Sequence, residues 1–300
     1  MDHSSKILVI SIFILNVTGC ANTELVRFSA IGDTPYFESD SELERLSETF
    51  EHMSTREIPF VVHVGDIFRG WTACSPDLYE TRAELFSKTP MPFFITIGDN
   101  EFNDCTDPEQ AQRFFREIIL GSPSIQKTIK GSSEKFESIR VTRQADMIEN
   151  ARWSVKNVTF IMLVLPDLPG NYPLKKEKIN TILNANIKFL KESFSVAKTN
   201  KHHSVILITH SEPALCRVPG CDNFNKILID QIRGFEKPVL LINGSNHDPE
   251  FVDGGYRGIP TWWHLRPGNE PEESWPEVIF SLNTHKFMVK WHDGPSAIKE

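Results

Sequence analysis

The sequence has no excess of basic residues. Its 300 residues include 32 Lys and Arg against 40 Asp and Glu, which gives a formal net charge of −8 at pH 7. This balance argues against a surface that holds nucleic acid through basic patches. The sequence also lacks internal repeats and low-complexity segments. A content of 40% hydrophobic and 24% charged residues is that of an ordinary globular chain, sufficient for one large domain or two small ones.

The apolar run near the N-terminus is shorter than a membrane span. It covers Ile7–Val17, follows Lys6, and fits the apolar core of a signal peptide. It ends in the tetrapeptide VTGC at Cys20, which resembles the lipobox of bacterial lipoproteins and implies cleavage before Cys20 and acylation of its thiol. An ordinary secreted protein with an incidental Cys20 is the alternative. Residues 1–19 are therefore predicted to be a signal peptide. The mature chain is expected to be exported, as a membrane-anchored lipoprotein or a periplasmic or extracellular protein.

Cysteine is scarce, with five residues in the chain. Without a lipidated Cys20, the remaining four are Cys74, Cys105, Cys216 and Cys221. An even number of cysteines in an oxidising compartment favours disulfides. We predict the pairs 74–105 and 216–221. A tetrahedral zinc site built from these thiols is the alternative, and the compartment disfavours it.

Six apolar, β-branched runs end at a polar residue that could bind metal, or at a residue next to such a potential ligand. The runs are LVRFSAIGD, PFVVHVGD, PFFITIGDNE, NVTFIMLVLPD, SVILITH and PVLLINGSNH, which end at Asp33, Asp66, Asp99 with Asn100, Asp167, His210 and His247. Buried parallel strands read as continuous apolar runs, and open α/β sheets bind ligands beyond the carboxyl ends of their strands. Acids, amides and imidazoles gathered at one sheet edge suit a divalent metal centre. The pattern therefore predicts a metal-dependent hydrolase.

Segments of helical period alternate with these strands. Helices are predicted over Ser39–Met53, Asp107–Leu120, Lys175–Ala197 and Asn223–Arg233. Strands that alternate with helices predict an α/β layered fold with much parallel pairing. The polar stretch Gly121–Asn150 is expected to be a surface excursion. After His247 the sequence predicts antiparallel strands that close a second sheet.

The order of the motifs resembles that of the calcineurin-like metallophosphoesterases. The motifs are GDTPY, then HVGDIF, then GDNE-F-x-DC, then a strand that ends in His, then a strand that ends in x-x-His. The resemblance extends from about Phe28 to about Asp293. It implies an αββα four-layer sandwich with a metal site at the C-terminal edge of its sheets. It also implies that residues 20–300 form a single calcineurin-like phosphoesterase domain.

The resemblance also implies a role for each residue. Asp33 would bind the first metal, and Asp66 would bridge both metals and serve catalysis. Asp99 stands where the family's Asn binds the second metal, and Asn100 stands where the family's substrate-facing His would be. His210 and His247 match the two remaining histidine ligands. The implied function is hydrolysis of small phosphorylated substrates by a hydroxide formed from metal-bound water. One or two divalent ions such as Mn, Fe or Zn would serve as cofactors.

Two positions depart from the family pattern. Pro35 stands where a histidine usually binds the first metal, and Tyr36 is a candidate for the missing donor. Ser245 stands where the first histidine of the terminal pair would be, and a neutral hydroxyl is a poor ligand compared with imidazole. Five ligands remain where the family pattern has about seven. An exported binding or scaffold protein with a degenerate site is therefore the alternative function.

Three further residues near the motifs receive other interpretations. His63 is expected to lie in the core rather than to bind metal. Glu101 is expected to orient a ligand from behind. Asp167 is interpreted as a turn residue at the end of its strand.

Overall fold

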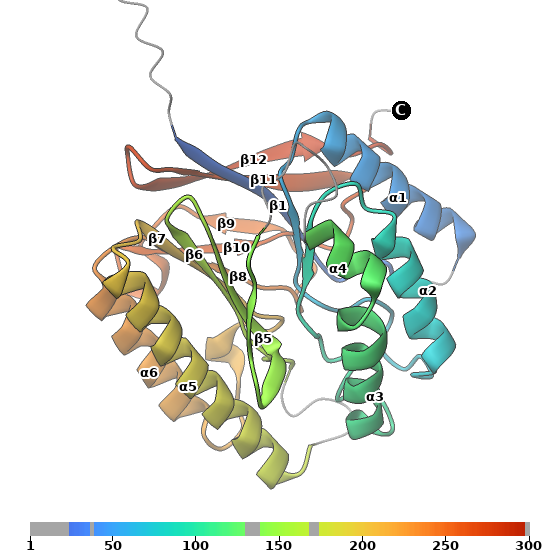
Figure 1. The fold of residues 1–300 in the computed structure, drawn as a ribbon, viewed down its shortest axis with the longest axis horizontal. Helices are drawn as coiled ribbons and strands as arrows, with labels where there is room; N and C mark the ends of the chain where they lie inside the picture. Colours follow the sequence, from blue (N-terminus) through green and yellow to red (C-terminus); the bar gives the residue numbers. More distant parts are fainter. Residues whose placement is uncertain (1–23, 37–38, 130–138, 168–173, 298–300) are drawn as a thin grey trace, which may run out of the picture.

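Two mixed β-sheets lie face to face, and helices cover the outer face of each sheet (Figure 1). The computed structural model describes residues 24–36, 39–129, 139–167 and 174–297. The predicted signal peptide and Cys20 lie outside the described residues. Within the described part, no helix is both long and apolar enough for a membrane crossing. The layers confirm the predicted αββα sandwich.

The first sheet carries three of the predicted site loops. Its strand order is β12-β11-β1-β2-β3. The parallel strands are β1 (Leu25–Ile31), β2 (Val61–His63) and β3 (Phe93–Ile95), and the antiparallel strands are β11 (Ser274–Ser281) and β12 (Lys286–Asp293). The predicted antiparallel strands of the C-terminal tail are confirmed. They extend the first sheet, however, because β11 pairs with β1, so the prediction that these two close a second sheet is wrong.

The second sheet carries the remaining site loops. Its order is β4-β5-β6-β7-β8-β10-β9. Its parallel strands are β6 (Val158–Met162), β7 (Ser204–Ile208), β8 (Val239–Ile242) and β10 (Trp262–Arg266). Antiparallel strands flank them: β4 (Thr142–Gln144), β5 (Met147–Val155) and β9 (Glu250–Val252). The C-terminal ends of β6, β7 and β8 therefore lie at one edge of this sheet.

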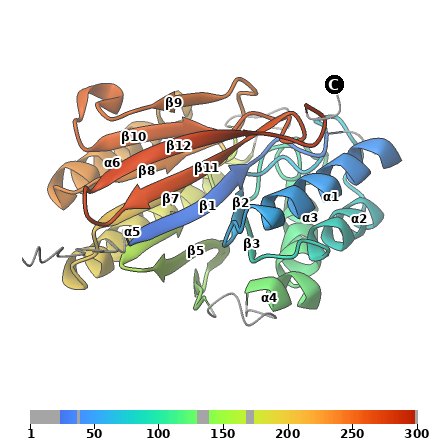
Figure 2. The same ribbon diagram turned by 90° about the horizontal axis from the view of Figure 1, so that it is seen from above.

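Helices cover both outer faces (Figure 2). Over the first sheet lie α1 (Asp40–Thr55), α2 (Pro76–Ser87), α3 (Pro108–Phe114), the π-helix η1 (Phe115–Leu120) and α4 (Pro123–Ile129). Over the second lie α5 (Lys176–Thr199) and α6 (Cys221–Phe235), with the short 3₁₀ turns η2 (Pro213–Leu215) and η3 (Tyr256–Gly258). The four predicted helices are confirmed. The prediction for residues 121–150 is wrong in part, because that stretch contains α4, β4 and the start of β5.

Aromatic side chains fill the space between the sheets. Phe94 of the first sheet stacks on Trp153 of the second, with ring centroids 4.1 Å apart, and Trp153 stacks on Phe160 at 5.2 Å. Phe28 and Phe60 stack within the first sheet at 5.3 Å. All five side chains are at most 3% exposed, and burial of aromatic surface is the main stabilising term of such an interface. This packing fixes the two sheets so that their C-terminal edges meet.

Two disulfides lie near the ends of the strands. Cys74–Cys105 joins the loop after β2 to the loop after β3, and Cys216–Cys221 closes the turn before α6. Both predicted pairs are confirmed. The first pair ties together two loops that carry site residues.

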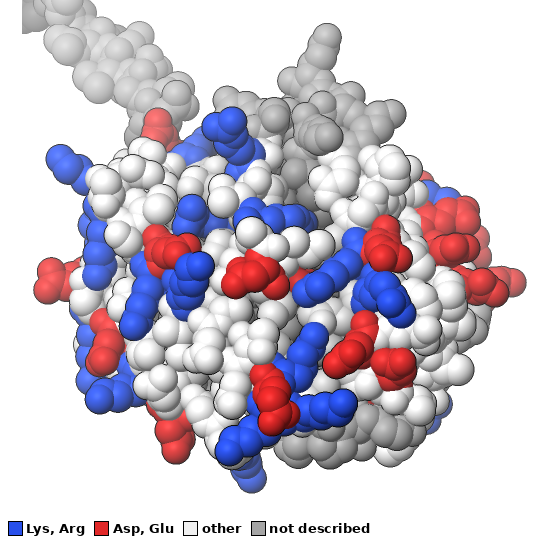
Figure 3. Space-filling view, turned by 60° about the horizontal axis from the view of Figure 1, so that its bottom comes forward, with Lys and Arg blue, Asp and Glu red and all other residues white. Residues whose placement is uncertain are grey.

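Charged side chains of both signs are interspersed on the face drawn in Figure 3. Lys and Arg alternate there with Asp and Glu, without a continuous stripe of one sign. This face therefore offers no continuous basic patch of the kind that holds a polyanion.

Candidate metal centre

Five polar side chains meet where the C-terminal edges of the two sheets face each other. Asp33, Asp66 and Asp99 follow β1, β2 and β3, whereas His210 and His247 follow β7 and β8. One potential ligand atom from each of Asp33, Asp66 and His210 lies within 4.8 Å of the other two. The fold therefore brings together side chains that are up to 214 positions apart in the chain (33 to 247).

Asp66 lies between the other four side chains. Its Oδ1 atom is 3.4 Å from His210 Nε2, which is 2.7 Å from Asp99 Oδ1. On the other side, His247 Nε2 is 3.8 Å from Asp33 Oδ1. The site thus has two halves, Asp33 with His247 and Asp99 with His210, and Asp66 is close to both.

The loops that carry the carboxylates need an unusual backbone. Asp33 and Asp66 have φ values of 53° and 58°, in the left-handed region that Asp tolerates better than most residues. Two glycines leave space for the carboxylates. A Cβ atom on Gly98 would lie 2.1 Å from Asp66 Oδ1, and one on Gly244 would lie 2.5 Å from Asp33 Oδ2. A side chain at either glycine would displace the neighbouring carboxylate.

Glu101 holds the loops from behind, as the sequence predicted. It is fully buried and accepts hydrogen bonds from the backbone N–H groups of Gly98 (2.6 Å), Asp66 (3.1 Å) and Ile67 (3.3 Å). Burial raises the pKa of Glu101, and the hydrogen bonds from Gly98 and Ile67 offset part of that rise. The carboxylate therefore fixes the backbone beside Asp66 without itself facing the centre.

The ring of His210 is oriented by the backbone. Its Nδ1 atom lies 2.8 Å from the carbonyl oxygen of Val64. A carbonyl only accepts hydrogen bonds, so Nδ1 carries a hydrogen and Nε2 is the ring atom directed at the acids. His63 behaves differently: it is fully buried, and its Nε2 donates to the carbonyl of Thr34 at 2.7 Å. The prediction that His63 belongs to the core is confirmed.

Several buried polar atoms of the site have no hydrogen-bond partner. Within the described residues these include Asp33 Oδ2, Asp99 Oδ1 and His210 Nε2. The last two are 2.7 Å apart and form an ion pair when His210 is protonated, which leaves Asp33 Oδ2 as the atom of the three without a polar neighbour of opposite character. Unsatisfied buried groups are rare in proteins, and each one calls for a missing partner. Carboxylate oxygens and an imidazole nitrogen directed at one point fit a divalent cation.

The buried acids and His210 shift one another's pKa values. Burial raises the pKa of Asp33 to about 7, even though the charge of His210 lowers it. Burial likewise raises the pKa of Asp66 well above its usual value. Burial alone would lower the pKa of His210, but the charges of Asp66 and Asp99 raise it well above the usual value. Bound protons therefore neutralise part of the negative charge that a cation would otherwise neutralise.

Tyr36, the candidate for the missing donor, places its hydroxyl between His247 and Asp66. Its hydroxyl lies 2.8 Å from His247 Nε2 and 3.4 Å from Asp66 Oδ2, and its backbone N–H donates to Glu42 Oε1 at 2.6 Å. Burial, followed by the charges of Asp66 and Asp33, raises the pKa of Tyr36. Its hydroxyl therefore stays protonated in the ion-free site.

Asn100 lies beside Tyr36 but is more enclosed than a substrate-facing residue would be. It is 6% exposed, its amide donates to the carbonyl of Phe68 at 2.9 Å, and its backbone N–H donates to Asp66 Oδ1 at 3.1 Å. The side chain also contacts the Tyr36 hydroxyl. A catalytic role for Asn100 stays a prediction.

Asp167 has more contacts than a turn residue needs. Its carboxylate accepts hydrogen bonds from the hydroxyls of Ser211 and Ser245, at the ends of the two neighbouring strands. The sequence contained one signal for this arrangement, since Asp167 ends an apolar run in the same way as Asp33 and Asp66. Ser211 was not singled out, because a serine after a strand has no distinctive pattern.

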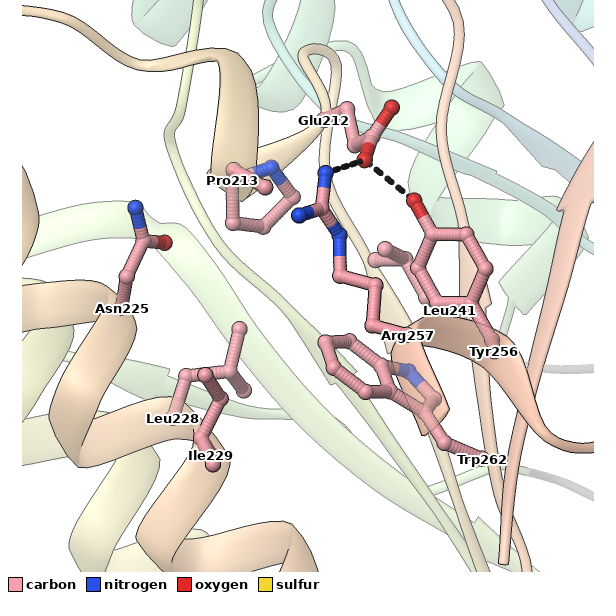
Figure 4. A pocket seen from close by; sticks show the side chains of 10 residues that line it. Glu212, Pro213, Asn225, Leu228, Ile229, Leu241, Tyr256, Arg257 and Trp262 are labelled. Carbon is pink, nitrogen blue, oxygen red and sulfur yellow. Dashed lines mark hydrogen bonds and ion pairs between the residues drawn. The ribbon is translucent and has the colours of Figure 1, made fainter. Parts of the chain in front are cut away.

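A separate cavity lies on the helix-covered side of the second sheet (Figure 4). Its volume is about 170 Å³, and α6, β8, η3 and the loop after β7 line it. Glu212 accepts hydrogen bonds from Arg257 (2.5 Å) and from the hydroxyl of Tyr256. The Tyr256 ring stacks on His264, whose Nε2 lies 2.7 Å from Asn243 Oδ1. The wall of this cavity thus supports the loop that carries Ser245 and His247.

Comparison with solved structures gives the class of fold. A dimetal phosphatase from Danio rerio is similar with a TM-score of 0.51, over 88% of this chain and 98% of that one, at 13% identity. A purple acid phosphatase from yellow lupin (Lupinus luteus) seeds gives 0.55, over 92% of this chain and 52% of the lupin chain, at 10% identity. No protein-family model and no curated protein sequence matches. The similarity shows that the chain has a metallophosphoesterase-like fold.

The ion-free site makes stability depend on pH and metal together. The pKa of Asp33 is raised on folding, so its contribution to stability is fully present below its unfolded pKa of 3.8 and is lost as pH rises through about 7. A divalent ion needs ionised ligands, so it should stabilise the protein more at pH 8 than at pH 6. At pH 8, manganese at 100 times its Kd should add about 2.7 kcal/mol. Thermal unfolding with manganese and with chelator at both pH values measures this difference. An equal or larger stabilisation by manganese at pH 6 would contradict this prediction.

Proposed function

We propose that this protein is an exported, metal-dependent phosphoesterase that hydrolyses small phosphorylated substrates. The observation that carries the proposal is the convergence of three acids and two imidazoles on one point between the sheets. The metallophosphoesterase-like fold supports it, since a dimetal phosphatase is among the similar structures. The chemistry of the donor set supports it as well, because mixed oxygen and nitrogen ligands suit ions such as Mn, Fe and Zn.

In this proposal each half of the site holds one divalent cation. Asp33 and His247 bind the first, Asp99 and His210 bind the second, and Asp66 binds both. Burial lowers the pKa of His247, which keeps its ring neutral and able to bind metal near pH 7. Divalent cations at such a site neutralise the charge of a phosphate ester and lower the pKa of bound water.

The residues around the cations would orient the substrate through hydrogen bonds. Tyr36 keeps its proton because its pKa is raised, so its hydroxyl can donate a hydrogen bond to a phosphate oxygen. Asn100 can donate a hydrogen bond but cannot transfer a proton to a leaving group. The enzyme should therefore prefer substrates whose leaving groups are already weak bases, such as aryl phosphates.

A second function has specific support from the sequence. Pro35 and Ser245 remove two imidazoles of the family pattern, and Asn100 removes a proton donor. An exported binding or scaffold protein could keep the fold with little or no catalysis. Elemental analysis of protein purified without added metal distinguishes the two functions, because a degenerate site should carry less than one ion per chain.

The bridging acid gives the direct test of the enzyme. Asp66→Asn should lower hydrolysis of an activated aryl phosphate by at least about 1000-fold, or about 4 kcal/mol, because the shared ligand of both cations is lost. Asn adopts the left-handed backbone of position 66 readily, so the fold should be kept. Initial rates and far-UV circular dichroism measure the two properties.

The matched control is Asp230→Asn, which makes the same chemical change on the exposed side of α6. It should leave the rate unchanged. An Asp66→Asn protein with a native spectrum and a rate within a few-fold of wild type would show that Asp66 does not bind the catalytic metal.

Export and anchoring form a separate part of the proposal, and they rest on the N-terminal sequence alone. Cys20→Ser should prevent acylation, so that the chain is released as a soluble protein or stays uncleaved. Metabolic labelling with a fatty acid should mark the wild-type chain only. Equal labelling of the Cys20→Ser chain would contradict the assignment of Cys20 as the anchor.

A further inference from the structure

Three neighbouring strands of the second sheet end in a cluster formed by Asp167, Ser211 and Ser245. Asp167 follows β6, Ser211 follows β7 and Ser245 follows β8, and these strands are adjacent and parallel. The Ser245 hydroxyl donates to Asp167 Oδ2 at 2.7 Å, and the Ser211 hydroxyl donates to Oδ1. Each carboxylate oxygen is thus held by one hydroxyl, and the carboxylate has a fixed orientation.

The backbone of Asp167 is joined to the Asp99 half of the metal centre, and its side chain is joined to the Asp33 half through Ser245. Its N–H group donates to the Asp99 carboxylate, and Asn103 Nδ2 donates to its carbonyl oxygen at 2.8 Å. On the other side, the backbone N–H of Ser245 donates to Asp33 Oδ1 at 3.0 Å. Asp167 is therefore next to Asp99, and Ser245 links it to Asp33.

We propose that the carboxylate of Asp167 is a ligand of the second divalent cation, in place of the imidazole that the chain lacks at Ser245. This inference rests on the proposed metal centre. Asp167 is exposed to solvent, whereas Asp33, Asp66 and His210 are at most 4% exposed. Together with Asp66, Asp99 and His210 it would complete the second site, on the side of that site that faces solvent.

The carboxylate has free capacity for an ion. An ionised carboxylate offers about four lone-pair positions, and the two serine hydroxyls use two of them. Serine itself is a poor substitute for imidazole, because its hydroxyl is neutral and here donates its hydrogen to Asp167. Ser211 and Ser245 are therefore positioning residues, which orient a ligand from behind as metal-site partners commonly do.

The balance of charge supports the same assignment. Two divalent cations carry four positive charges. Asp33, Asp66 and Asp99 supply three negative charges, and the imidazole ligands are neutral when they bind metal. Asp167 would supply a fourth among the side chains that contact the cations, whereas Glu101 is held by backbone N–H groups behind the loops.

The test counts manganese ions per chain by isothermal titration, with electron paramagnetic resonance of the bound ions as a second readout. The wild-type protein should bind two ions with a spin-coupled signal. Asp167→Ala should weaken the second site by at least about 100-fold, since even loss of a partner behind a ligand weakens binding 10- to 100-fold. The electron paramagnetic resonance signal of Asp167→Ala should be that of isolated manganese ions. Asp167→Asn keeps a carbonyl oxygen and should give an intermediate affinity.

Two controls and one rescue variant distinguish a metal ligand from a residue that only supports the loops. Asp230→Asn should bind two ions as the wild type does. The double variant Ser211→Ala, Ser245→Ala removes both hydrogen bonds but keeps the carboxylate, so it should weaken binding of the second ion about 10- to 100-fold, less than Asp167→Ala does. Adding Ser245→His to Asp167→Ala should restore the second ion, because histidine tolerates the left-handed backbone of position 245 (φ 66°).

The outcomes distinguish this inference from the proposed function. Two ions in Asp167→Ala with wild-type affinity would overturn the role of Asp167 and leave the metal centre intact. A single ion in the wild-type protein would overturn the inference and leave a one-metal enzyme. No ion in the wild-type protein would overturn the proposed function as well.

Discussion

The concentration of buried negative charge between the two sheets is the constraint on which the rest of the site depends. Asp33, Asp66 and Glu101 are at most 4% exposed, and burial raises the pKa of each. Glu101 is satisfied by three backbone N–H groups, whereas Asp33 and Asp66 need positive charge from elsewhere. His210 provides some of it. A divalent cation would provide the remainder while the carboxylates stay ionised.

The sequence was sufficient to predict which strand ends meet. Asp33, Asp66, Asp99 and His210 each end an apolar run, and the geometry of parallel strands brings such residues to one edge. Glu101 could also be predicted, because its motif places it directly behind the ligand loops. The partner of β11 could not be predicted. Alternation of apolar and polar residues indicates that a strand has two different faces, but it does not indicate which strand it pairs with. The contacts of Asp167 with Ser211 and Ser245 could not be predicted for a related reason, because they depend on the spatial order of β6, β7 and β8.

The departures from the family pattern change the character of the donor set. The hydroxyl of Tyr36 occupies the space next to His247, and the carboxylate of Asp167 lies next to Ser245. Both groups present oxygen atoms where the family pattern has imidazoles. In the proposed function these departures would exchange one donor type for another.

Anomalous diffraction from crystals grown with manganese tests the central claim most directly. The account predicts anomalous density in contact with the Asp66 carboxylate, between Asp33 and His247 on one side and Asp99 and His210 on the other. Anomalous density elsewhere on the molecule, with none at Asp66 in a crystal that contains excess manganese, would contradict it.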